Sequence, residues 1–191
     1  MPLSDPASRD LLHLRDIALR GYLRADGAID VEAHLSDTKT YDFPNEDRGR
    51  IDRGEELHGM WLRLTVDDSM TILAAEAAMD ATPHAVCPGA APNFARLAGL
   101  TIGKGFLKGA MERVGGTQGC THLRELLQQV ATVAIQTRFS VRAHRSARQG
   151  RMERDDWGVP SFLLNTCHAY DEDGPLVARR RQPVKSDEAA E

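Results

Sequence analysis

Three cysteines and the histidines near them are the residues of this sequence best suited to chemistry. Cys120 follows a glycine-rich loop at the expected start of a helix, with His122 two residues further on. Cys87 lies where an expected strand ends, and Cys167 is followed directly by His168. Free backbone N–H groups and the positive end of the macrodipole stabilise a thiolate at a helix start. Thiolates bind zinc and iron and also act as nucleophiles, so the pattern fits two kinds of chemistry.

The first hypothesis is a small metal-binding domain whose site lies at the junction of a sheet and helices. Its candidate ligands are the residues that can supply sulfur or nitrogen there: Cys87, Cys120, His58, His122 and Cys167. Such a mixed set suits zinc or iron better than an exchangeable iron–sulfur cluster. The sequence contains no C-x-x-C and no H-E-x-x-H, so the hypothesis depends on the position of the cysteines at element boundaries.

The second hypothesis is a thiol-dependent enzyme. Cys120 would be the nucleophile, with His122 or His168 as its base, and the loop 115–119 would bind an anion. Glycines that stop one helix and turn into the next explain this loop more simply. The third hypothesis is an accessory or ligand-binding domain whose cysteines only pack as small apolar residues. Whether the protein is an enzyme therefore stays open at this point.

The composition is that of an ordinary globular domain. The chain has 191 residues, 41% apolar and 27% charged, with a net charge of −4. The negative balance argues against a dedicated nucleic-acid-binding protein. No apolar run approaches the roughly 18 residues that cross a membrane, and we expect no signal peptide. An odd number of cysteines makes no disulfide framework, so we expect a cytoplasmic protein, with a protein partner or a homodimer left open.

One main domain is expected, with less ordered segments around it. Residues 1–11 are predicted to form a disordered leader and residues 12–178 a single α+β domain. Within that domain, residues 143–158 are predicted to be an exposed basic linker. Residues 179–191 are predicted to be a charged, solvated tail.

Alternation of apolar and polar residues predicts the strands. Four segments are expected to be extended: 16–24, 28–38, 60–66 and 71–82. The first two flank Asp26-Gly27, which is a strong hairpin signal. Residues 40–56 are polar and rich in turn residues, so they are predicted to be a loop. Residues 71–82 suit either a helix or a returning strand, and we favour the strand.

Helices are expected from residue 88 onward. Pro92 lies where the first turn of a helix tolerates proline, and a second short helix is expected over 106–114. A long helix is expected from about 121 to 141, with its buried face repeating at the helical period. The predicted fold class is therefore α+β: an antiparallel sheet of about four strands, in two hairpins, followed by helices packed on one face.

Five stretches of the sequence resemble a bacterial family known as domain of unknown function 2889. These stretches are 19–24, 37–44, 60–65, 115–123 and 165–169. Together they span most of residues 12–182. The resemblance implies a fold neighbourhood and carries no activity.

A more distant resemblance is to the NifU-type iron–sulfur scaffold domain, in which a small antiparallel sheet precedes helices and cysteines hold a cluster or zinc. Cys87, after a strand, and Cys120, at a helix start, match two of its ligand positions. The first cysteine of the scaffold is absent, and its place falls near His58. The resemblance implies a His58, Cys87 and Cys120 set, completed by His122 or Cys167.

Overall fold

The computed structural model describes residues 3–150 and 163–181 of the chain. The chain divides into two compact units, one ending at residue 138 and the other beginning at residue 139. The first unit contains a sheet and the helices that cover it. No helix within the described part of the chain is long and apolar enough to cross a membrane.

Four antiparallel strands form the main sheet of the first unit, as the alternation predicts. They are β1 (His13–Leu23), β2 (Ile29–Lys39), β5 (Glu56–Val66) and β6 (Ile72–Ala81), in the order β1-β2-β5-β6. The Asp26-Gly27 turn joins β1 and β2, and Gly27 has the positive φ of 90° that such a turn requires. The predicted α+β fold class is confirmed, and residues 72–81 are a strand rather than a helix.

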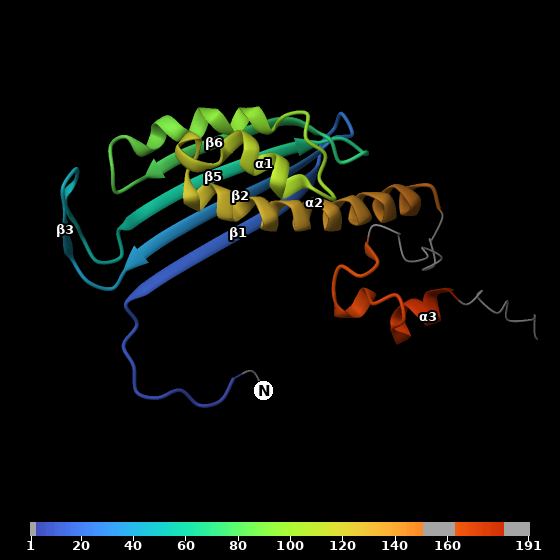
Figure 1. Ribbon diagram of the computed structural model, residues 1–191, viewed down its shortest axis with the longest axis horizontal. Coiled ribbons are helices and arrows are strands. Elements are labelled where there is room, and N and C mark those ends of the chain that lie inside the picture. The colour runs from blue at the N-terminus through green and yellow to red at the C-terminus, as the bar shows by residue number, and fades with distance from the viewer. Residues whose placement is uncertain (1–2, 151–162, 182–191) are drawn as a thin grey trace, which may run out of the picture. The chain divides into compact units, whose positions relative to one another are not determined.

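One face of this sheet is buried and the other is exposed. Every second residue of β2 faces the core and is completely buried, namely Ile29, Val31, Ala33 and Leu35. On the opposite face, Trp61 and Tyr22 remain 36% and 44% exposed. The helices of the first unit therefore cover one face only, as Figure 1 shows.

A second, two-stranded sheet occupies part of the predicted loop 40–56. The loop prediction is therefore wrong for the residues of its two strands. β3 (Phe43–Asn45) pairs antiparallel with β4 (Gly49–Ile51). The side chain of Asn45 accepts hydrogen bonds from the backbone N–H groups of Asp47 and Arg48, which fixes the turn. Ile51 is completely buried and anchors the ribbon to the rest of the unit.

The covering elements are η1 (Cys87–Leu97), α1 (Phe106–Val114), η2 (Gly116–Gln118) and α2 (Thr121–Arg148). η1 is a 3₁₀ helix that contains Pro92 in its interior, where a proline has no N–H to offer to an α-helical bond. α1 coincides with the predicted helix 106–114. The apolar faces of α1 and α2 are buried. Val114 of α1 is completely buried, as are Leu123, Leu126 and Val130 of α2.

α2 is longer than predicted, which corrects the expectation of a basic linker over 143–158. Residues 143–148 belong to the helix, and the chain stays helical until just before Gly150, whose φ is 70°. The segment 142–148 contains alanine and arginine, which favour helices, and no glycine or proline that would end one. Residues 151–158 lie outside the described residues.

Glycines allow close backbone contacts around the start of α2. A Cβ atom on Gly119 would lie 2.1 Å from the carbonyl oxygen of Val114, and one on Gly115 would lie 2.2 Å from that of Met111. Gly21 on β1 admits Thr137 of α2, since a Cβ there would lie 1.9 Å from the Thr137 hydroxyl oxygen. Gly115 and Gly119 therefore let the chain turn tightly against the end of α1, and Gly21 lets α2 pack closely on the sheet.

The described part of the second unit beyond α2 contains η4 (His168–Tyr170) and α3 (Pro175–Arg181). Val177 of α3 is completely buried. Arg179–Arg181 form the last turn of α3, so the predicted charged tail begins as a helix. Residues 182–191 lie outside the described residues, as do 1–2 of the predicted leader, whose residues 3–11 form no helix or strand.

Candidate functional site

A buried carboxylate lies at the end of the core-facing row of β2. Asp37 continues the series of completely buried residues on that strand, and its side chain is only 1% exposed. Arg15, directly opposite on β1, donates from Nε to Oδ1 and from Nη2 to Oδ2, both at 2.7 Å. A buried charge must be paired, and this two-pronged contact pairs it in the geometry that arginine and carboxylate favour.

Two histidines add to the contacts of the same carboxylate. His58, opposite Asp37 on β5, places Nδ1 2.9 Å from Oδ2. His13 on β1 places Nε2 3.3 Å from Oδ1. The pairing of β2 with β5 shifts register between Asp37 and Thr38, so a bulge lies at the site. Asp37 therefore has three hydrogen-bond contacts, two from Arg15 and one from His58, and His13 lies close to its Oδ1.

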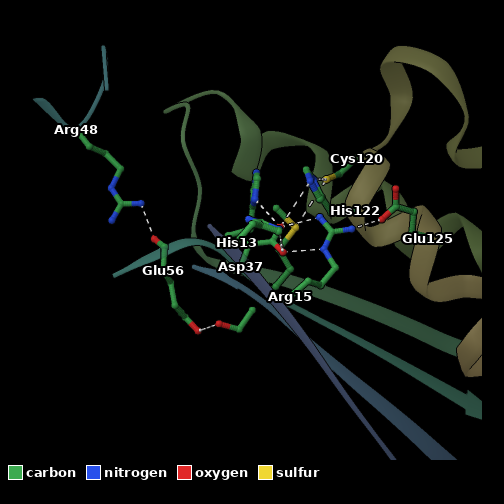
Figure 2. Close-up of polar contacts among 11 residues, drawn as sticks. His13, Arg15, Asp37, Arg48, Glu56, Cys120, His122 and Glu125 are labelled. Carbon is green, nitrogen blue, oxygen red and sulfur yellow. Dashed lines mark hydrogen bonds and ion pairs between the residues drawn. The ribbon is translucent and has the colours of Figure 1, made fainter. Parts of the chain in front are cut away.

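The start of α2 brings a third histidine to the cluster. His122 Nε2 lies 4.0 Å from Asp37 Oδ2, and its ring lies against that of His58, tilted by 35° with the centroids 3.9 Å apart. One turn further along α2, Glu125 Oε2 accepts from Nη1 of Arg15 at 2.6 Å. Figure 2 shows these side chains converging from the sheet and from α2. We call Arg15, Asp37, His58, His122 and Glu125 the Asp37 cluster.

The environment of the cluster sets its charges. Burial acts to raise the pKa of Asp37, but the hydrogen bond and the charge of Arg15 outweigh it and hold the pKa below its usual range. Burial lowers the pKa of His58, and the neighbouring His122 lowers it further. Burial, followed by the charge of Arg15, lowers the pKa of His122. Asp37 is therefore ionised near neutral pH while both imidazoles are neutral.

Neutral imidazoles and a carboxylate are ligands for divalent transition metals. One donor atom from each of Asp37, His58 and His122 lies within 4.8 Å of the other two. Among the residues that the structure describes, no other set of three histidine, cysteine or acidic side chains meets this criterion. The arrangement supplies two nitrogens and one oxygen from three different elements.

A sequence model of a known family, described as Protein of unknown function (DUF2889), matches residues 13–136. This chain belongs to that family. The matched segment contains the whole Asp37 cluster and ends before Cys167. No curated protein and no solved structure matches the chain, so the resemblance to the NifU-type scaffold domain gains no support.

Within the DUF2889 segment, Cys120 lies beside the cluster but outside its set of possible ligands. It precedes the first residue of α2, and its Sγ lies 3.8 Å from Nδ1 of His122 and 3.8 Å from Sδ of Met60. The predicted association of Cys120 with His122 is therefore present. The sulfur approaches the ring nitrogen that faces away from Asp37, and the side chain is half-buried.

The other two cysteines belong to no metal-ligand group among the described residues. Cys87 begins η1 after a turn in which its N–H bonds to the carbonyl of His84. That turn is held by Asp47, which accepts from the N–H of Ala85, so it is directed toward the β3–β4 ribbon. Cys167 is exposed and lies in the second unit, beyond the residues that match the DUF2889 family. The structure thus joins His58 with His122 and places Asp37 where the sequence analysis expected sulfur.

Asp37, Arg15 and Glu125 are the members of the cluster that sequence reasoning missed. A signal was present, because Asp37 occupies the next inward position after Leu35 in an alternating row of apolar residues. Arg15 likewise precedes Ile17 and Leu19 with the same spacing of two. A charged residue on the buried face of a strand needs a partner, and an opposite charge on the adjoining strand can supply it.

Proposed function

We propose that this DUF2889 domain binds a divalent transition metal, zinc or iron, through Asp37, His58 and His122. The observation that carries the proposal is the convergence of three donor atoms within 4.8 Å. The lowered pKa values of both histidines support it, because a ring nitrogen must be unprotonated to bind a metal. Two imidazoles and one carboxylate with further positions open are typical of iron(II) and zinc sites.

The proposal replaces sulfur by oxygen in the ligand set expected from the sequence. His58 and His122 are kept, and Asp37 takes the place of Cys87 and Cys120. A carboxylate oxygen is a harder ligand than a thiolate sulfur. This disfavours an iron–sulfur cluster and leaves mononuclear zinc or iron. His58 and His122 are 12% and 26% exposed, so the site is accessible to an ion from solution.

The test is elemental analysis of the full chain purified without a histidine tag and then titrated with Zn²⁺ or, anaerobically, Fe²⁺. One metal per chain is expected, and His58→Ala and His122→Ala should each abolish stoichiometric binding. His84→Ala is the matched control, since His84 contacts Asp47 away from the cluster and should leave binding unchanged. Substoichiometric metal that is unaffected by His58→Ala and His122→Ala would contradict the proposal.

A second candidate, the thiol nucleophile, is favoured by one specific contact. Cys120 Sγ lies 3.8 Å from Nδ1 of His122, at the start of a helix of 28 residues. A neutral imidazole at that distance can accept the thiol proton after a small approach. Iodoacetamide should then alkylate Cys120 stoichiometrically in the native, metal-free protein, and His122→Ala should slow the reaction. Resistance of all three thiols until unfolding would exclude this candidate.

A further inference from the structure

Arg15 already supplies a positive charge to Asp37, the carboxylate of the proposed metal site. Both of its contacts to Asp37 are 2.7 Å long, and Asp37 is 1% exposed, so little water competes for that carboxylate. His58 also contacts Oδ2, and His13 lies 3.3 Å from Oδ1, so both oxygens of Asp37 already have neighbours. An ion that binds an oxygen of Asp37 therefore competes with these contacts.

Of the contacts to Asp37, the one from the Arg15 guanidinium is the one that a bound cation would displace most easily. A divalent cation bound to Asp37 would lie a few ångströms from a permanent positive charge, and the two would repel strongly in a buried setting. His58, by contrast, is itself a proposed ligand of the ion. The repulsion falls only if Arg15 moves away.

A second carboxylate, that of Glu125, can pair with Arg15 when Arg15 leaves Asp37. Glu125 already accepts from Nη1 at 2.6 Å, and it is 48% exposed, at the mouth of the cluster. Arg15 is itself 31% exposed and so has solvent on one side into which it can shift. Transfer from Asp37 to Glu125 keeps the arginine paired throughout.

From these contacts we infer that Arg15 is an exchangeable occupant of the cation site, which metal displaces from Asp37 onto Glu125. The inference rests on the proposed function and adds regulation to it. Because coupling is reciprocal, whatever strengthens the Arg15–Asp37 pair weakens metal binding, and whatever draws Arg15 toward Glu125 strengthens it. β1, which carries Arg15, thereby responds to metal occupancy.

Zinc affinity of the full chain tests the inference, measured by competition with a chromophoric chelator. Arg15→Gln removes the competing cation and should tighten zinc binding by about tenfold, within the usual range of coupling between sites. Glu125→Gln removes the receiving carboxylate and should weaken binding. Equal or weaker binding by a folded Arg15→Gln variant would overturn the inference while leaving the proposed function intact. If the wild type and all variants bind no zinc, the proposed function fails and the inference with it.

A second measurement avoids variants that fail to fold. In the wild-type protein, the Nε–H resonance of Arg15 should shift on addition of one equivalent of zinc, because its bond to Asp37 Oδ1 is lost. The control is the Nε–H of Arg63, which donates to Glu32 on the exposed face of the sheet at 2.8 Å and should not move. An unchanged Arg15 resonance in protein that has bound one zinc would overturn the inference.

Discussion

The two faces of the main sheet each hold an arginine between two carboxylates, and only one of these arrangements is buried. On the covered face, Arg15 bridges Asp37 and Glu125. On the open face, Arg63 bridges Glu32 and Glu76 at 2.7 and 3.0 Å. The contact distances are similar, but Asp37 is 1% exposed while Glu32 and Glu76 are 26% and 73% exposed.

Burial, rather than the length of the contacts, therefore distinguishes the Asp37 cluster from the Arg63 contacts. Exposed ion pairs contribute little because water solvates each partner nearly as well. A buried carboxylate has lost that alternative, so it depends on Arg15 and on the imidazoles. Burial also lowers the pKa of both histidines, whereas no comparable imidazole pair adjoins Arg63 among the described residues.

Removing the buried charge of Asp37 should destabilise the protein most. Asp37→Asn should lower the free energy of unfolding by about 3 kcal/mol, because Arg15 loses the charge that pairs it and one of the two acceptor oxygens becomes an NH₂ donor. Urea denaturation of the metal-free protein at pH 7.5 measures this loss. A loss below about 0.5 kcal/mol, the scale of an ordinary surface substitution, would show that burial does not set the cluster apart.

The pH dependence of stability should come from the same face. The pKa values of His58 and His122 are lowered from 6.5 in the folded protein, so the unfolded chain binds protons first as the pH falls. Their contribution is therefore complete above pH 6.5 and is lost as the pH falls from there toward their folded pKa values. Urea denaturation in chelator between pH 7.5 and 5 should show this decline, and the His58→Gln/His122→Gln double variant should flatten it. Constant stability of the wild type across that range would contradict the expectation.

The sheet could be predicted from sequence because one of its faces is buried. Alternation along residues 29–35 follows directly from that asymmetry, whereas β6, which is less buried, has a sequence that also suits a helix. The β3–β4 ribbon could not be predicted in this way, since three residues per strand are too few to show a period. It depends instead on the side-chain bonds of Asn45 and the burial of Ile51.

The candidate site was predictable only in part. The sequence predicts that His58 and His122 belong to one site, and in the structure their ring centroids lie 3.9 Å apart. Their meeting point was not visible, because it depends on where α2 crosses the sheet and on a bulge after Asp37, both of which are long-range features. The cysteines are reactive residue types, so they are the obvious candidates in the sequence. The residue that most of the cluster contacts is Asp37, whose only sequence signal is its position in the core-facing row of β2.

The smallest expected effect is on the open face. Glu32→Gln removes one partner of Arg63, which keeps Glu76 and gains water, so the free energy of unfolding should fall by less than about 1 kcal/mol. The same urea measurement used for Asp37→Asn gives the value, so the two variants can be compared at one pH. Raising the salt concentration should shrink the effect of Glu32→Gln more than that of Asp37→Asn, since solvent ions screen exposed charges first. If Glu32→Gln costs as much as Asp37→Asn, contact geometry and not burial governs both arginines, and the case for a distinct cluster on the covered face is lost.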